Sequence, residues 1–291
     1  MTLPIHDTTV LYPAGTIENT ATVLHVETLP DGRAAVLLDQ TACHPVDAGW
    51  PDQGADRGAL DAADGSTVIV DDCVVAATNG SALFIGADVP VRPGEDGWAF
   101  VVAHLVGEPA PIAEGDEVTV HVAGAYRRAL SRGHTACHLA SLALNAALAD
   151  RWTKQPREDG LGNPDFDKEA IQSSRILESG SLDRFRLNKS LRRKGFTTDG
   201  LADELEQVTK DVNATLAEWI ATGTPVRIDR DGDRLTDRRY WVAELAGATV
   251  RIPCGGTHAT SLAELGDTRV ELTVDGDGGT SILQMRTTAS A

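Results

Sequence analysis

The 291-residue chain contains no apolar run approaching the roughly 18 residues that a membrane-spanning helix needs. Its first residues, MTLPIHDTTV, lack the basic start and the apolar stretch of a secretory signal peptide. The sequence has only four cysteines, and they do not form the spaced ladder of small disulfide-rich secreted domains. These absences predict a cytoplasmic protein with free thiols and no membrane partner.

Basic charge is also scarce, because 26 Lys and Arg residues face 43 Asp and Glu residues and give a net charge of −17. The acidic residues are dispersed along the chain, which argues against a broad basic surface for nucleic acid. The hydrophobic content of 42% and the charged content of 24% are otherwise those of an ordinary globular protein. The length allows one large domain or two ordinary ones.

Short β-rich runs separated by Gly, Pro and Asp characterise the N-terminal part of the chain. This pattern is typical of a small barrel or sandwich, and we assign residues 1–124 to a β-barrel domain. The expected strands are Ala21–Thr28, Ala34–Leu38, Ser66–Asp71, Ser81–Ile85, Trp98–Ala103 and Glu117–Val122.

The pattern changes after residue 124, where Leu and Ala recur at helical spacing and predict a helix over Ala125–Asp150. Further helices are expected over Lys168–Leu177 and Asp199–Ala221. Helices and antiparallel strands segregated in this way indicate an α+β domain, which we assign to residues 125–291. Its expected strands are Pro225–Ile228, Arg239–Val242, Thr249–Ile252, Arg269–Val274 and Ser281–Arg286.

The segment RGHTACHLASLAL places His134 and His138 four residues apart on the first predicted helix. Side chains at this spacing lie on one face with their Cβ atoms about 5–6 Å apart, so both imidazoles can reach one ion. Two ordinary surface or core histidines would produce the same pattern. Cys137 lies between them and is expected to be a small buried helix residue rather than a ligand.

A second pair, Cys254 and His258, lies in the segment IPCGGTH after a β-rich run. The two glycines disfavour a regular helix and allow a tight turn that points a thiolate and an imidazole at the same place. Both groups are suitable zinc ligands. Together the two pairs predict one divalent metal ion, expected to be zinc, bound by His134, His138, Cys254 and His258.

The segments HTACHL and CGGTH resemble the HxxxH and CxxxH signatures of the alanyl-tRNA synthetase editing domain and its free-standing relatives, the alanyl-tRNA editing proteins. The segment LLDQTACHPVDAGWPDQGADRG lies where such proteins carry an LD-x-T…FYPxGGGQ-x-x-DxG sequence. After CGGTH, ATSLAELGDTRVEL has the family's short acidic stretch, glycine and strand. The resemblance covers most of the chain and implies a small N-terminal barrel followed by an editing domain. Threonyl-tRNA editing domains share the paired motifs, but CGGTH favours the alanyl branch.

The resemblance implies a zinc-dependent deacylase of mischarged aminoacyl-tRNA, with tRNA as partner and seryl- or glycyl-tRNA for alanine as substrate. A zinc-bound water would attack the ester, because zinc lowers the pKa of bound water towards about 7 and polarises a carbonyl. Four protein ligands would close the site, so Cys254 or His258 on the glycine turn is expected to yield. Thr135 and Gln53 are catalytic candidates, and Thr257 is a further polar neighbour. No general base is assigned, because Glu264 is expected to be a solvated surface residue.

Two departures from the family concern substrate recognition. The glycine-rich GGQ stretch, which the family associates with the choice of amino acid, appears here as Pro51-Asp52-Gln53-Gly54, and only Gln53 matches. The Gln-Lys-Gly-Ser sequence appears as Glu178-Ser179-Gly180-Ser181. The amino-acid specificity therefore does not carry over. Cys43 and His44, beside the first stretch, are expected to be structural or to line the pocket.

The basic stretch RFRLNKSLRRKG is a candidate for contacting tRNA phosphates. A solvated basic face paired with nearby acids is an equal alternative. The candidate residues are Arg184, Arg186, Lys189, Arg192, Arg193 and Lys194, helped by Arg127, Arg128 and Arg132.

Two other functions remain open. The chain could hydrolyse small amino-acid esters or amides without tRNA, as its acidic charge and its altered glycine motif favour. It could also be a non-catalytic module that zinc holds together.

Overall fold

The structure, a computed structural model, describes residues 3–107, 112–276 and 281–290. The elements are helices and mostly antiparallel strands, so the α+β class expected from the sequence is confirmed. The chain divides into two compact units. Unit 1 comprises Met1–Arg127, Arg230–Arg239 and Cys254–Thr257, and unit 2 comprises Arg128–Asp229, Tyr240–Pro253 and His258–Ala291. The sequence analysis did not anticipate the two later segments of unit 1.

Unit 1 contains a sheet with the strand order β5-β9-β2-β3-β8-β6-β7. Strand β5 pairs with β6 as well as with β9, so the pairings of β5, β9, β2, β3, β8 and β6 return to their starting point. The short strand β1 pairs in parallel with β4. The strands are β1 (Thr9–Val10), β2 (Glu18–Thr28), β3 (Ala34–Leu38), β4 (Gln40–Thr41), β5 (Gly58–Ala62), β6 (Thr67–Thr78), β7 (Leu83–Ile85), β8 (Ala99–Val106) and β9 (Glu117–Val122).

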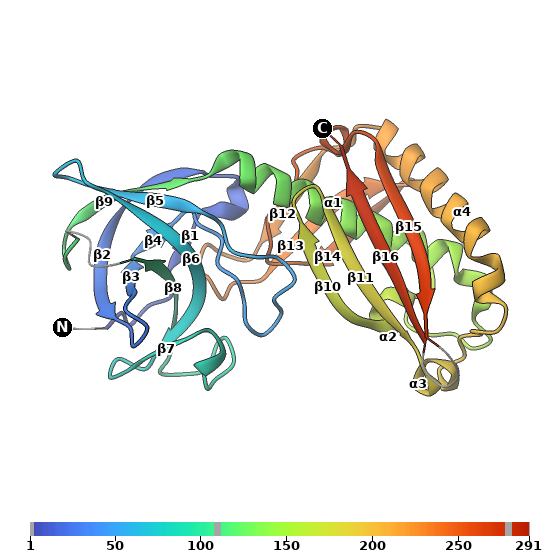
Figure 1. Ribbon diagram of the computed structural model, residues 1–291, viewed down its shortest axis with the longest axis horizontal. Helices are drawn as coiled ribbons and strands as arrows, with labels where there is room; N and C mark the ends of the chain where they lie inside the picture. The colour runs from blue at the N-terminus through green and yellow to red at the C-terminus, as the bar shows by residue number, and fades with distance from the viewer. Residues whose placement is uncertain (1–2, 108–111, 277–280, 291) are drawn as a thin grey trace. The chain divides into compact units, whose positions relative to one another are not determined.

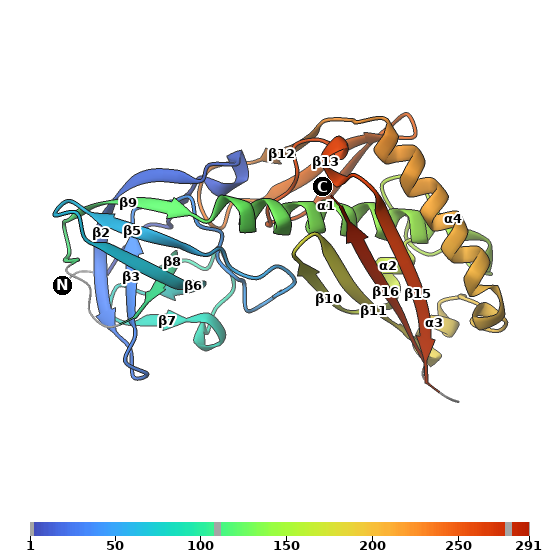
Figure 2. The ribbon, with the colours of Figure 1, turned by 45° about the horizontal axis from the view of Figure 1, so that its top comes forward.

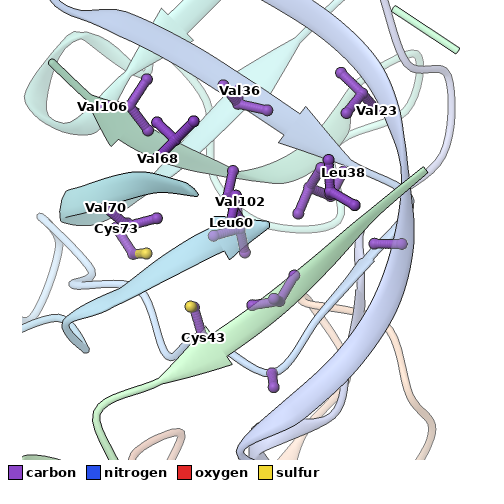
Figure 3. Packing of buried hydrophobic residues seen from close by; sticks show 14 of the residues in the cluster. Val23, Val36, Leu38, Cys43, Leu60, Val68, Val70, Cys73, Val102 and Val106 are labelled. Atoms are coloured by element: carbon purple, nitrogen blue, oxygen red, sulfur yellow. The ribbon is translucent and has the colours of Figure 1, made fainter. Parts of the chain in front are cut away.

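The core of unit 1 consists of β-branched and leucine side chains that alternate along these strands. Val36, Val102 and Leu60 belong to it, together with Cys43 and Cys73, and all are essentially inaccessible to solvent. Figure 3 shows these side chains directed into the space that the strands enclose. Each fully buried valine or leucine contributes about 1.5–3 kcal/mol relative to exposure, so this apolar interior holds the strands together.

Unit 2 contains two antiparallel sheets with the strand orders β10-β11-β16-β15 and β12-β13-β14. Figures 1 and 2 show the long helices of this unit beside the first sheet. The strands are β10 (Ile171–Leu177), β11 (Gly180–Leu187), β12 (Val226–Arg230), β13 (Arg239–Leu245), β14 (Ala248–Pro253), β15 (Thr268–Asp275) and β16 (Ser281–Ala289). The helices are α1 (Gly124–Ala147), α2 (Phe166–Ala170), α3 (Lys189–Arg193) and α4 (Leu201–Ala221).

Helix α1 approaches the β10–β11 turn closely at Gly133. A Cβ atom at this position would lie 2.4 Å from the carbonyl oxygen of Leu177 and 2.5 Å from that of Gly180. The Ser179 N–H also donates to the carbonyl of Ala129 on the helix, at 2.8 Å. A glycine is therefore needed here despite its low helix propensity, and it brings the following turn of α1 against the hairpin.

Helix α4 packs on β15 through Val208, Val212 and Leu216, which recur at helical spacing and are buried. Asn213 adds two hydrogen bonds, because its amide donates to the carbonyl of Val270 and accepts from the Val270 N–H, at 2.9 and 2.8 Å. Among the described helices, none is long and apolar enough to cross a membrane.

The prediction of a helix over Lys168–Leu177 was wrong. Helix α2 ends at Ala170, and the following residues form β10, which pairs with β11. The strand buries Ile176 and exposes Arg175, an alternation that suits a sheet with one covered face. Strand β11 was not anticipated because its exposed arginines made the segment look like a basic stretch.

Candidate metal centre

Three histidines of unit 2 lie close together. The ring centroids of His134 and His138 on α1 are 4.9 Å apart. The His258 ring lies 4.3 Å from that of His134 and 5.0 Å from that of His138, and it stacks on the latter. The helical spacing therefore places two imidazoles on one face, as expected, and the residue after the CGGT turn adds the third.

Cys254 completes this group, in which one potential ligand atom from each of His134, His138, Cys254 and His258 lies within 4.8 Å of all the others. This donor set of imidazoles and a thiol suits zinc better than it suits hard cations such as Mg²⁺. The residues that the sequence singled out thus meet at one place and fit the ion. Metal binding itself stays a prediction.

The environment of Cys254 keeps its thiol protonated when no metal is bound. Burial, with a smaller contribution from the Asp52 carboxylate, raises the pKa of the Cys254 thiol to about 12, against a lowering by the Gly256 backbone amide. The Cys254 N–H donates to the Arg239 carbonyl at 3.0 Å, which anchors the start of the glycine turn.

Thr135 connects α1 to the segment that follows the turn. It is fully buried, and its hydroxyl oxygen accepts the Ala259 N–H at 3.0 Å. The same oxygen lies 3.3 Å from His258 Nδ1. If Nδ1 donates this bond, Nε2 of His258 presents its lone pair to a metal, as a second-shell contact of a metal-binding histidine requires. The position suits a residue that orients a ligand.

Gln53 holds Thr257, the residue before His258, with both ends of its amide. Its Nε2 donates to the Thr257 hydroxyl at 2.9 Å, and its Oε1 accepts the Thr257 N–H at 3.0 Å. Both side chains are buried. The family motif pointed to Gln53, but its partner could not be read from the sequence because the two residues lie far apart in the chain.

Trp241 on β13 was missed by the sequence analysis. Its ring is fully buried and lies 5.4 Å from the His138 ring and 6.4 Å from the His258 ring. An aromatic side chain at this place covers one side of the histidines with apolar surface. Its location inside a predicted strand was the available signal, although that signal says nothing of the imidazoles.

The basic residues fall into two groups. Arg186, Lys189, Arg193 and Lys194 are exposed, whereas Arg192 is partly buried. Lys194 forms an ion pair with Glu169. Arg128 and Arg184 are exposed as well.

The expectation that Arg127 helps to bind phosphates was wrong. Its guanidinium is buried in an ion pair with the carboxylate of Asp56, and no charge is left at the surface. Arg132 is partly buried and donates to the Glu264 carbonyl at 2.9 Å and to the Ser179 hydroxyl at 3.1 Å.

No family model matches the chain. The alanyl-tRNA editing protein AlaX-M of Pyrococcus horikoshii is 27% identical over 233 residues, which cover 80% of this chain and 77% of that protein. The alanine–tRNA ligase of Solibacter usitatus is 27% identical over 248 residues, and the chloroplastic/mitochondrial enzyme of Ostreococcus lucimarinus is 26% identical over 250 residues. Each match covers 84% of this chain but only 23% of the ligase. These similarities confirm the resemblance seen in the two motifs.

Proposed function

We propose that this chain, a relative of the alanyl-tRNA editing proteins, is a zinc-dependent hydrolase that removes the amino acid from mischarged tRNA in trans. The observation that carries the proposal is the convergence of His134, His138, Cys254 and His258 in a chain similar to a free-standing editing protein. The amino acid proposed to be removed is serine or glycine esterified to tRNA for alanine. The cytoplasm is the proposed location, and the closed series of strand pairings in unit 1 is interpreted as the small N-terminal barrel.

The proposed zinc ligands are the three histidines and Cys254. When bound, zinc supplies Lewis-acid activation of the ester carbonyl and of water. Four protein donors would fill a tetrahedral zinc site, so one of them would have to give way to substrate. Cys254 or His258 is the proposed one, because Gly255 and Gly256 let this turn move more readily than helix α1.

Thr135 and Gln53 act as positioning residues in this proposal. Thr135 fixes the ring of His258 through Nδ1, and Gln53 fixes the backbone immediately before it through Thr257. Both act through the CGGTH turn rather than through contact with the reacting ester. Trp241 restricts water on its side of the histidines, which strengthens electrostatic interactions there.

The open face of the sheet β10-β11-β16-β15 is the proposed phosphate-binding surface. Arg184 and Arg186 alternate with buried residues along β11 and point away from the face that Asp183 and Phe185 cover. Leu182 lies on the same face, and it is paired with Arg175 on β10 and with Arg286 on β16. Four exposed arginines therefore share one face of an otherwise acidic chain. Such a local concentration of positive charge suits an RNA backbone.

The proposed function is tested by incubating the purified full chain with a panel of tRNAs charged with serine, glycine, threonine or alanine and measuring deacylation. We expect release of serine or glycine from tRNA for alanine, lost in His134→Ala and after chelation. Arg227→Ala, exposed and outside both the metal group and the proposed phosphate-binding face, is the matched control for the preparation. Hydrolysis of a small seryl ester without any activity on tRNA would favour a small-molecule esterase. Unfolding on chelation with no hydrolysis of either substrate would favour a zinc-held structural module.

A further inference from the structure

We propose that Cys43, Cys73 and His104 form a second metal site inside unit 1, for a thiophilic divalent cation such as zinc. Cys43 was expected from the sequence to be structural or pocket-lining. One potential ligand atom from each of the three residues lies within 4.8 Å of the other two. All three side chains are inaccessible to solvent.

The strand register places two of these ligands face to face. Cys73 on β6 and His104 on β8 are directly opposite each other in the antiparallel ladder. Side chains at such positions point to the same face, with Cβ atoms about 4.5–5.5 Å apart. Cys43 follows β4, and Figure 3 shows its sulfur and that of Cys73 directed into the same interior space.

The hydrogen bonds of His104 prepare one ring nitrogen for a metal. Nδ1 lies 3.0 Å from the Val36 carbonyl oxygen. A carbonyl can only accept, so Nδ1 carries the proton and Nε2 presents a lone pair. A backbone carbonyl that fixes the tautomer in this way is typical of metal-binding histidines.

Thr41 organises the other side of the group. Its hydroxyl lies 2.8 Å from His104 Nε2 and donates to that lone pair, while its oxygen accepts the Cys43 N–H at 3.0 Å. A bound cation would replace the Thr41 hydrogen bond at Nε2. Thr41, whose oxygen lies beside both His104 Nε2 and the Cys43 N–H, would supply the fourth donor of a tetrahedral site.

Charge favours a divalent ion. Two thiolates and a neutral imidazole carry a charge of −2, and uptake of one divalent cation, with release of the two thiol protons to solvent, leaves the group neutral. Burial of uncompensated charge is costly, so a monovalent ion would be disfavoured here. Sulfur and imidazole donors select zinc over Mg²⁺ and Ca²⁺.

The test separates the two metal groups. In the full chain carrying His134→Ala and His138→Ala, elemental analysis after gel filtration should still find one zinc per chain. Adding Cys73→Ser should remove that zinc. Adding Cys137→Ser should not, because this buried cysteine of unit 2 belongs to neither group.

A second measurement does not depend on whether the variants fold. The unmutated chain is denatured with and without a chelator, alkylated, and mapped by mass spectrometry. We expect Cys43 and Cys73 to react as free thiols, and zinc to be released together with the exposure of both. Absence of zinc from the double-histidine chain, in a folded sample, would overturn the proposal. A Cys43–Cys73 disulfide, seen as thiols that alkylate only after reduction, would overturn it as well.

Discussion

Arg127 and Asp56 form a buried ion pair in which the guanidinium Nε lies 2.8 Å from Oδ1 and 2.9 Å from Oδ2 of the carboxylate. The pair is embedded in further bonds, because Arg127 Nη2 donates to the Ala42 carbonyl at 2.7 Å and Asp56 accepts the His44 N–H at 2.6 Å. It therefore connects the first turns of α1 with the segment around residues 42–56.

Replacing Arg127 should destabilise the protein strongly. Arg127→Ala leaves the Asp56 carboxylate buried without its cation, which costs about 3–5 kcal/mol for a buried pair. Urea unfolding measures the loss. The neighbouring Arg128→Ala is the control, and because its side chain is exposed we expect a change within about 0.5 kcal/mol. Equal losses in the two variants would show that the ion pair contributes nothing particular.

Gly133→Ala should be destabilising although alanine favours helices. The added Cβ would meet two backbone carbonyls at 2.4 and 2.5 Å, and overpacking of this kind costs about 1–3 kcal/mol. Gly54→Ala serves as the comparison, because no atom lies within 4 Å of the Cβ at that position. A more stable Gly133→Ala protein would mean that α1 and the β10–β11 turn can separate without penalty.

Gln53 and Thr257 should prove energetically coupled. Gln53→Leu leaves the buried N–H and hydroxyl of Thr257 without these partners, at a cost of about 1–3 kcal/mol for each unsatisfied group. We expect lower deacylation with zinc retained, since Gln53 holds the turn and not the metal. A double-mutant cycle with Thr257→Val should give a coupling energy of about 0.5–3 kcal/mol. Simple additivity of the two substitutions would argue against the link.

Stability should fall with rising pH through Asp167. Burial, together with the Asp183 and Asp165 carboxylates, raises the pKa of this carboxyl to about 7, against a lowering by the Ser141 hydrogen bond. An unfolded aspartate titrates near about 3.9, so between that pH and about 7 the folded state binds more protons than the unfolded state. Stability therefore decreases as pH rises across this window.

Asp167→Asn should flatten this pH dependence in urea unfolding measured at several pH values. Asp150→Asn, an exposed substitution, controls for the change in net charge. An unchanged slope in Asp167→Asn would assign the pH dependence to other groups.

The open face of the sheet β10-β11-β16-β15, which carries Arg175, Arg184, Arg186 and Arg286, should govern the affinity for tRNA. If Arg184 and Arg186 contact phosphates, the logarithm of affinity falls with the logarithm of salt by about 0.7–0.9 per contact. Arg184→Ala with Arg186→Ala should weaken binding and reduce the slope, while sparing hydrolysis of a small ester. The control is Arg227→Ala with Arg251→Ala, exposed arginines on other strands. If the variant with Arg184→Ala and Arg186→Ala binds tRNA like the parent at every salt concentration, these arginines are solvated surface residues and do not contact tRNA.

Local sequence patterns predicted those helices and strands whose apolar residues recur with a clear period. Strands Ala34–Leu38 and Glu117–Val122 have the expected bounds, and α1 and α4 lie within a few residues of theirs. The segment after Ala170 failed because its alternation is short and interrupted by serines, so tertiary pairing with β11 decides its structure.

The same distinction between local patterns and long-range contacts applies to the candidate site. The spacing of His134 and His138 is a local property of one helix, and the sequence revealed it. The contacts of Gln53 with Thr257, and of Trp241 with the histidines, join residues that are distant in the chain. No periodicity records such contacts, and only the fold brings them into view.

Unit 1 has a consequence for synthesis on the ribosome, because its residues do not emerge together. The Val10 N–H donates to the Asp233 carbonyl at 2.8 Å, the Leu235 N–H donates to the Thr8 carbonyl at 3.0 Å, and the Arg239 guanidinium lies over the Tyr12 ring. A nascent chain that ends before residue 230 leaves these N-terminal groups without those partners. The N-terminal residues of unit 1, although translated first, can form these contacts only after residues 233–239 have been synthesised. The unit 1 strands therefore leave the exit tunnel before all of their native partners are available.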